Sequence, residues 1–396
     1  MLQSDIATFP RYGSLYGYSP FREVQLLIDG HLAGVVWPFP IIFTGGVVPG
    51  LWRPIVGIDA FDLREDEIDI TPWLGLLSDG NAHTFEVRVA GLYNNSMKSV
   101  ELSDFAGSYW LITGKIFVWL DDIDHTTTGS MPNYDKSITR FQAKSSTLKG
   151  ANGKNHTLLY EVHAHRDLLL RSIINLSTGP EPATWHQSLK FANTGNFTRN
   201  ADIEINNQRT FGQDTSSSGY ARQYNYPLYA YSEYEVVKDN IYIVAEVSHG
   251  KDVKVVSPSV FPTGLDLFST CRIARDAYPK FEGAWLATTQ TGTATYLANE
   301  TALKSFSFGQ TEQDMTLKGI HRAVGEPSLD HLNVDGRSKI LYHRRVEAIN
   351  GTVVQDNESL LDTPIGHVYG PLRPVEMQSY VASEAQRHRT GWKTWK

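Results

Sequence analysis

The stretch PFREVQLLIDGHLAGVVWPFPIIFTGGVVPGLWRPIVGIDAFDL, residues 20–63, decides the fold. It is too apolar for a surface loop and too rich in glycine and proline for a helix. The uncharged run from Leu32 to Trp52 has the length of a membrane helix, but three prolines interrupt it. We therefore expect buried β structure with bends over this run, and no membrane segment.

Alternating apolar and polar residues, broken by turn dipeptides, continue outward from this stretch. Residues 22–28 alternate as in a strand, Asp29-Gly30 is a hairpin turn, and residues 32–37 form the returning strand. Further strands are expected at residues 83–89 and 109–120, and in many runs between 158 and 348. Sustained helical periodicity is absent, so the sequence predicts an all-β protein built from antiparallel sandwiches.

Composition divides the chain into two predicted β units. The first unit covers residues 1–124, and the second sandwich domain covers residues 158–360. Residues 125–157 between them are mostly Thr, Ser, Gly, Asn and Lys, which favours a linker or a long surface loop. Residues 361–396 are expected to form a tail, whose basic end carries two tryptophans.

Charge and motif content exclude several classes of function. The chain is 41% hydrophobic and 20% charged, with a net charge of −7 and no basic stripe, so nucleic acid is not expected as a partner. His163 and His165 would share one face of a strand, but two ligands do not make a zinc site. The single cysteine, Cys271, is expected to be a small buried hydrophobe. We expect no metal and no cofactor.

Seven Asn-x-Ser/Thr sequons indicate the secretory pathway, because roughly three would be expected by chance. Residues 1–20 show no charged region followed by an apolar region, so no signal segment is visible in this chain. The protein is expected to be extracellular or vacuolar. The predicted glycosylation sites are Asn94, Asn155, Asn175, Asn196, Asn299, Asn350 and Asn357.

The stretch 20–63 closely resembles the peptide:N-glycanase A type of plant and fungal glycoamidases. Those proteins carry a block of the form FREV…DG…PF…TGG…P…WRP…G…FDL, and every part of it is present here. The likeness continues densely through TPWLGLLSDGNAHTFEVRV (residues 71–89) and WLITGKIFVWLDD (residues 110–122). Residues 158–360 match loosely. ILYHRRVEAINGTVV (residues 340–354) resembles a late block where relatives often have a cysteine, which this chain lacks.

The resemblance implies a hydrolase that cuts the amide between an N-linked glycan and its asparagine, with N-glycopeptides as substrates. It also implies jelly-roll sandwiches and an active site between two of them. Relatives are longer, with a signal segment and a β-domain ahead of the block. The chain is therefore expected to be a fungal-type member truncated at its N-terminus, with an incomplete first sandwich and at most half of the cleft. The alternative is a non-catalytic carbohydrate-binding β-sandwich, or an inactive truncated relative.

Hydrolysis of this amide needs a carboxylate to activate water, donors for the developing oxyanion and an acid for the leaving glycosylamine. Candidate catalytic residues inside the block are Glu23, Asp59 and Asp62. Glu23 lies beside large apolar residues, where a raised pKa is expected. Each of these carboxylates has a structural salt bridge or a turn contact as its alternative interpretation. The candidate substrate-binding residues are Arg22, Trp37, Trp52 and Arg53.

Overall fold

The computed structural model describes residues 5–9, 20–61, 65–94, 100–103, 106, 110–257, 281–299, 301–321, 338–361, 363–365 and 380–381. Strands make up 66% of the structure and helices 5%, and the strands pair antiparallel. The predicted all-β antiparallel fold is therefore confirmed, whereas the jelly-roll connectivity stays a prediction. No helix within the described ranges is long and apolar enough to cross a bilayer.

A small antiparallel sheet contains the predicted hairpin. Its order is β2-β1-β3-β4, and the β1–β2 turn is made by Asp29 and Gly30, both at positive φ. A positive φ suits Gly and is tolerated by Asp, which explains why this dipeptide ends β1. The strands of this sheet are β1 (Glu23–Ile28), β2 (His31–Val36), β3 (Phe85–Asn94) and β4 (Val100–Ser103).

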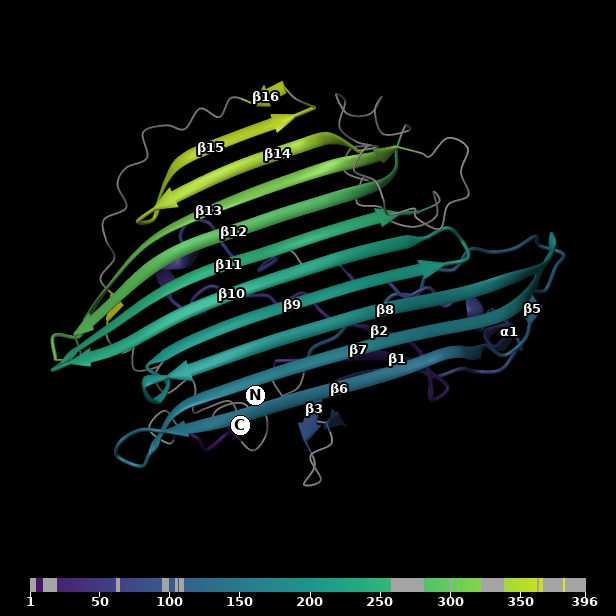
Figure 1. Ribbon diagram of the computed structural model, residues 1–396. Helices are drawn as coiled ribbons and strands as arrows, with labels where there is room; N and C mark the ends of the chain where they lie inside the picture. Colours follow the sequence, from purple (N-terminus) through teal and green to yellow (C-terminus); the bar gives the residue numbers. More distant parts are fainter. Residues whose placement is uncertain are drawn as a thin grey trace.

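A second, much larger sheet holds the other thirteen strands of the described ranges (Figure 1). Its order is β16-β15-β14-β13-β12-β11-β10-β9-β8-β7-β5; β6 also pairs with β7, and β17 with β13. Its members are β5 (Thr128–Gly129), β6 (Asn133–Lys149), β7 (Asn155–Leu176), β8 (Gly179–Thr198), β9 (Ile203–Ser216), β10 (Ala221–Val237), β11 (Asn240–Val256), β12 (Phe281–Asn299), β13 (Lys304–His321), β14 (Ser338–Ile349), β15 (Thr352–Leu360), β16 (Thr363–Ile365) and β17 (Tyr380–Val381).

The helical elements that lie wholly within the described ranges are single turns. Three of them precede β3: η3 (Pro49–Trp52), η4 (Thr71–Trp73) and α1 (Leu74–Leu77). The fourth, η5 (Arg199–Ala201), joins β8 to β9. Pro49 and Pro72 lie in the first turns of η3 and η4, where a missing N–H is tolerated.

Two segments differ from the sequence prediction. Residues 125–157, expected to be a linker or loop, contain β5 and the 17-residue strand β6. β6 lies at the edge of the sheet and exposes most of its side chains, so water tolerates its polar composition. Residues 110–120, expected to be a strand, are extended but belong to neither sheet. The strands of residues 158–360 thus share one sheet with the segment expected to separate them from the first unit.

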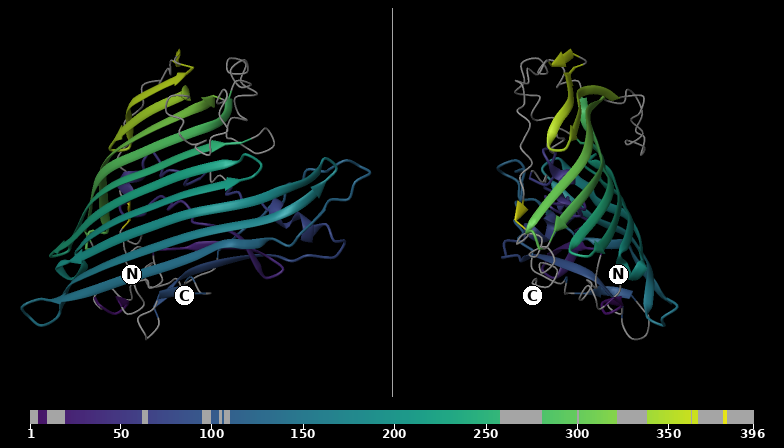
Figure 2. Two further views of the ribbon diagram at one scale, coloured as in Figure 1. Left: turned by 45° about the vertical axis from the view of Figure 1, so that its right-hand side comes forward. Right: turned by 90° about the vertical axis from the view of Figure 1, so that its left-hand side faces the viewer.

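The small sheet packs face to face on the part of the large sheet that contains β7–β10. The two sheets join through a buried aromatic cluster, in which Phe21 contacts Trp37 at 5.0 Å and Phe191 at 5.3 Å between ring centroids. Figure 2 shows the large sheet from the side, with its strongly twisted strands and the small sheet against its lower half. Residues of both sheets contribute to this core, including Val35, Leu92, Leu158, Leu189 and Tyr226.

After β2 the chain crosses to the upper part of the large sheet. This Gly/Pro segment, residues 38–61, lies on the same face of β11–β13 that is covered by the small sheet lower down. Thr311 donates to the carbonyl of Leu51 (2.7 Å), and Gln290 donates to the carbonyl of Val56 (2.9 Å). A Cβ on Gly50 would lie 2.4 Å from Ser307 Oγ, so only glycine fits there. The segment is rich in glycine because its backbone packs directly on the sheet.

Candidate functional site

Glu23 is completely buried between the two sheets, and its carboxylate accepts four hydrogen bonds from neighbouring side chains. Arg166 of β7 binds it with two hydrogen bonds, Nε to Oε2 (2.8 Å) and Nη2 to Oε1 (2.6 Å). Trp37 Nε1 donates to Oε2 (2.9 Å) and Gln25 Nε2 donates to Oε1 (2.8 Å). A carboxylate has about four acceptor directions, and these four bonds use them. Glu23 thus ties the small sheet to the large one, and solvent does not reach it.

The other candidates from the stretch 20–63 do not meet at one point. Trp37 and Trp52 are each 2% exposed, and Trp52 Nε1 donates to the carbonyl of Gly46 (2.7 Å). Arg22 is half-buried and donates to the carbonyls of Phe21 (2.7 Å) and Ala106 (3.2 Å). Burial lowers the pKa of Arg22. Arg53 is exposed, and Asp62 lies outside the described residues.

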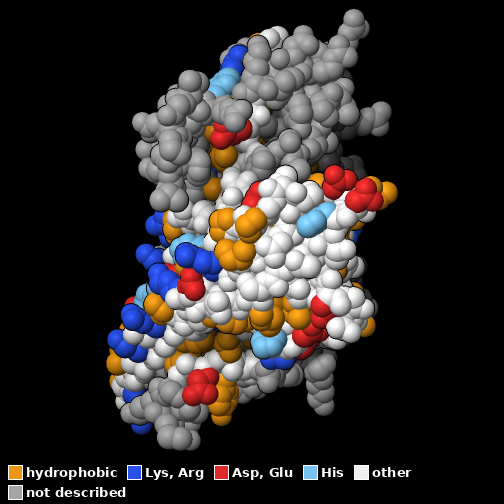
Figure 3. Space-filling view, turned by 90° about the vertical axis from the view of Figure 1, so that its right-hand side faces the viewer, with side chains coloured by type: hydrophobic (Ala, Val, Ile, Leu, Met, Phe, Trp, Pro, Cys, Tyr) orange, Lys and Arg blue, Asp and Glu red, His pale blue; other side chains and the backbone are white. Residues whose placement is uncertain are grey.

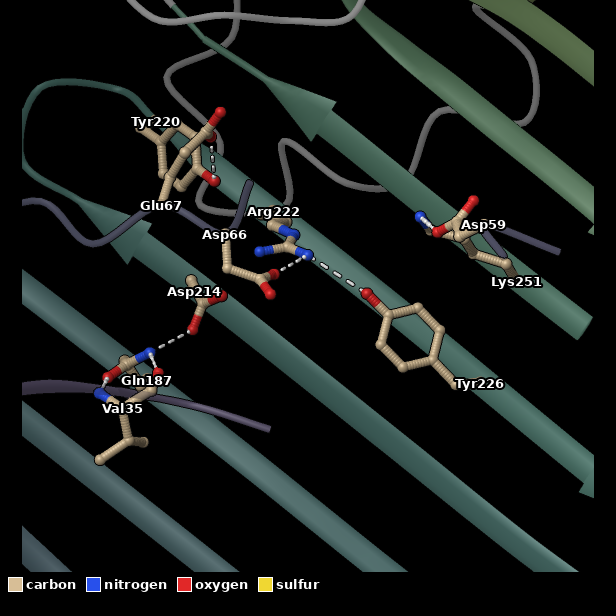
Figure 4. A network of polar contacts seen from close by, with 10 residues as sticks. All are labelled: Val35, Asp59, Asp66, Glu67, Gln187, Asp214, Tyr220, Arg222, Tyr226 and Lys251. Atoms are coloured by element: carbon tan, nitrogen blue, oxygen red, sulfur yellow. Dashed lines mark hydrogen bonds and ion pairs between the residues drawn. The ribbon is translucent and has the colours of Figure 1, made fainter. Parts of the chain in front are cut away.

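Asp59 is the candidate carboxylate that solvent can still reach. It lies near the end of the Gly/Pro segment at a φ of 58° and forms an ion pair with Lys251 of β11. The side chains of Asp59 and Lys251 are 17% and 11% exposed. Lys251 Nζ also lies 5.3 Å from the ring centroid of Phe39. Figure 4 shows the pair at one end of a network of polar side chains on the inner face of β8–β11.

Arg222 of β10 occupies the middle of this network. Its Nη2 donates to Asp66 Oδ1 (2.8 Å) and to Tyr226 Oη (3.2 Å), and the guanidinium lies 4.8 Å from the ring centroid of Tyr224. The side chains of Arg222 and Asp66 are 12% and 32% exposed. Next to them, Tyr220 Oη donates to Glu67 Oε2 (3.1 Å). A mostly buried guanidinium and a partly exposed carboxylate therefore belong to the same network as the Asp59–Lys251 pair (Figure 4).

A second, buried carboxylate lies behind Arg222. Asp214 of β9 is 3% exposed and accepts a hydrogen bond from Gln187 Nε2 (2.8 Å). The same amide binds both the N–H (2.8 Å) and the carbonyl (2.9 Å) of Val35, so it caps the open edge of β2. Burial raises the pKa of Asp214 to about 6, although Arg222 and the bond from Gln187 act in the opposite direction. Asp214 can therefore exchange a proton close to neutral pH.

His249 of β11 lies under the Gly/Pro segment. Its ring stacks on Phe39, with 4.6 Å between centroids and 11° between planes, and both ring nitrogens lack a partner among the described residues. Burial lowers the pKa of His249 to about 4, so the ring is neutral in mildly acidic solution. The ring of Phe39 thus lies close to both a neutral imidazole and the Lys251 ammonium.

Sequence reasoning missed most of this network. Asp66 and Glu67 were not among the candidate residues, yet they bind Arg222 and Tyr220. One signal was present in the sequence: Lys251 interrupts the apolar side of β11, between His249 and Val253. His163 contacts Glu161 (2.5 Å) on the outer face of the sheet. The described part of the chain has no cluster of three His, Cys, Asp or Glu residues arranged to hold a metal.

Two stretches of the chain match known family domains. Residues 1–137 match the family model described as peptide N-acetyl-β-D-glucosaminyl asparaginase amidase A, and residues 159–228 match the PNGase A C-terminal domain. The chain belongs to the peptide:N-glycanase A family. The first family domain thus contains the small sheet and the Gly/Pro segment, and the second contains β7–β9 and the first part of β10.

A peptide:N-glycanase A protein of Prunus dulcis shows the relationship in more detail. It is named peptide-N4-(N-acetyl-β-glucosaminyl)asparagine amidase A and is 29% identical over 226 residues. The match covers 55% of this chain and 36% of that protein, so the chain spans about a third of the length of its relative. No solved structure matches the peptide:N-glycanase A chain described here.

Proposed function

We propose that this protein hydrolyses the amide between an N-linked glycan and asparagine in glycopeptides. Membership of the peptide:N-glycanase A family supports the reaction class, as does the name of the Prunus dulcis relative. The observation that carries the proposal for this chain is the Asp59–Lys251 ion pair. It joins a carboxylate of the first family domain to a cation of β11, and solvent reaches both side chains.

The groups around this pair match the needs of the reaction. Asp59 accepts a proton from water as the water oxygen attacks the carboxamide carbon. Lys251 and Arg222 supply positive charge for the developing oxyanion. The C–N bond then breaks as Asp59, which carries the proton taken from water, returns that proton to the nitrogen of the leaving glycosylamine. Asp62 remains a candidate acid or base. Glu23 also remains in the candidate set, but its burial and its four hydrogen bonds favour a positioning role.

The substrate-binding candidates take different roles in this proposal. Arg53 is exposed and suits a clamp on a sugar hydroxyl or an acetamide group. Trp37 and Trp52 are buried, so they act by holding Glu23 and the Gly/Pro segment in place rather than by stacking on sugar. Arg22 likewise fixes the chain ahead of β1 through two carbonyls.

A glycopeptide assay separates this function from that of a carbohydrate-binding module. The protein is incubated with a defined glycopeptide, and the products are measured by mass spectrometry. An amidase converts the glycosylated asparagine to aspartate, a mass increase of about 1 Da over the unglycosylated asparagine peptide. Retention of the glycopeptide on the immobilised protein without this conversion would support the non-catalytic alternative.

Glycosylation and secretion are a second part of the proposal. The amide nitrogens of Asn155, Asn175 and Asn299 already donate hydrogen bonds within the protein. Asn350 and Asn357 are exposed on or beside β14 and β15. We expect these two to carry glycans most completely in protein from its own host, as measured by glycopeptide mapping. Unmodified Asn350 and Asn357 would contradict passage through the secretory pathway. Asn196 is half-buried, and the side chain of Asn94 lies outside the described residues.

A further inference from the structure

Residues 110–123, the apolar ribbon, carry the three most exposed large hydrophobic side chains of the described residues. Leu111, Leu120 and Ile123 are 93%, 91% and 94% exposed, and Phe117 and Val118 are 64% and 66% exposed. The ribbon is extended and belongs to neither sheet. It leads into β5, at the end of the molecule where Figure 3 shows apolar side chains reaching the surface between basic and acidic ones. A continuous apolar surface of this kind marks an interaction site.

The pattern of the ribbon defines what can cover it. Ile116, Val118 and Leu120 lie on one side of an extended chain, and Phe117 and Trp119 lie on the other. A segment that is apolar on both sides is typical of a strand packed on both faces. A segment that pairs with it must therefore supply free backbone N–H and C=O groups as well as apolar side chains. A second extended apolar ribbon supplies both.

Two residues of opposite charge flank the central part of the ribbon, residues 116–120. Lys115 lies three residues before Val118, and Asp121 lies three residues after it. Ser177 donates to Asp121 from its backbone N–H (2.8 Å) and from its hydroxyl, and these bonds lower the pKa of Asp121 to about 2. Asp121 is thus ionised. Lys115 holds Glu65 at 2.6 Å, but both side chains are more than half exposed.

We propose that two copies of this chain pair antiparallel through residues 114–122, with the two-fold axis at Val118. This register places Lys115 opposite Asp121 of the partner subunit, Ile116 opposite the partner's Leu120, and Phe117 opposite the partner's Trp119. Each pair occurs twice because the interface is isologous. Opposite charges and aromatic pairs directly across two strands are the combinations that stabilise an antiparallel ladder. Other registers bring Lys115 opposite an apolar residue, a threonine or Lys115 of the partner subunit, except where it meets Asp122 or Asp124.

Sedimentation equilibrium of the full chain over a wide concentration range tests the proposal. Val118→Lys places two ammonium groups against each other on the axis and should raise the dimer dissociation constant by at least about a hundredfold. Leu111→Lys is the matched control, because Leu111 is equally apolar and exposed but lies outside the paired segment. It should leave the dissociation constant within about threefold of the original value. Thermal melts check that all variants keep their fold.

A charge exchange tests the register itself. Lys115→Asp should weaken the dimer, and the double variant Lys115→Asp with Asp121→Lys should restore it, because each strand then again faces an opposite charge. A protein that stays monomeric at every concentration would overturn the proposal. So would assembly that Val118→Lys and Leu111→Lys weaken equally, or that the charge exchange does not restore, because such assembly has no defined register.

Discussion

Arg166→Leu should lower the free energy of unfolding by about 3–5 kcal/mol, because it leaves the Glu23 carboxylate buried without its cation. Arg166 supplies two of the four hydrogen bonds to Glu23, and solvent cannot replace them at a side chain that is 0% exposed. Urea unfolding followed by tryptophan fluorescence measures the loss. It should appear as a lower midpoint with an unchanged slope.

Two further variants serve as controls for Arg166→Leu: the first breaks an exposed ion pair elsewhere, and the second removes both charges of the buried pair. Arg88→Met removes the partner of Glu86 from an exposed pair, in which both side chains are about half exposed, and should cost less than about 1 kcal/mol. The double variant Glu23→Leu with Arg166→Leu removes both charges and should recover most of the stability lost by Arg166→Leu alone. If Arg166→Leu unfolds at the original urea concentration, the pair does not hold the two sheets together.

Asp59→Asn should reduce the rate of glycopeptide hydrolysis by about two to four orders of magnitude, the usual cost of removing a general base. Asparagine keeps the size of the side chain but cannot accept a proton from water. The thermal midpoint should fall as well, because the mostly buried Lys251 ammonium loses its partner, but the variant should stay folded at the assay temperature. The measurement is glycan release by the whole protein, beside a melt of the same sample.

Glu161→Gln is the matched control for this variant. Glu161 lies on the outer face of β7, away from the Gly/Pro segment, and its carboxylate binds His163. Its replacement should leave the rate near that of the original protein. Near-full activity of Asp59→Asn would move the catalytic carboxylate to Asp62 or to another part of the family's longer chain. Equal losses of activity and of stability would show that Asp59 has a structural role.

Local features of the fold could be predicted from the sequence, because their causes are local. The β1–β2 hairpin follows from alternation around Asp29-Gly30 and lies within a residue or two of its predicted ends. β6 was missed because a strand at a sheet edge can be almost entirely polar. Residues 109–120, most of which lie in the apolar ribbon, were expected to be a strand, and their composition is that of a strand packed on both faces.

The candidate site was predictable only in part, because its partners are distant in sequence. Glu23 was expected among apolar groups and is buried, but its cation is 143 residues away. Asp59 meets Lys251 across 192 residues, and nothing near either residue in the sequence specifies that pairing. Sequence analysis could therefore name candidate residues within the stretch 20–63. It could not name the partners that β9–β11 contribute to the network.

The distance in sequence between the Gly/Pro segment and its docking surface has a consequence for synthesis. The bond from Thr311 to Leu51 spans 260 residues, and Gln290 reaches Val56 across 234. Residues 38–61 therefore leave the ribosome long before β11–β13 exist. During that interval their apolar side chains have no native surface to cover them. They stay exposed to solvent or bound to a chaperone until more than two hundred further residues have been added.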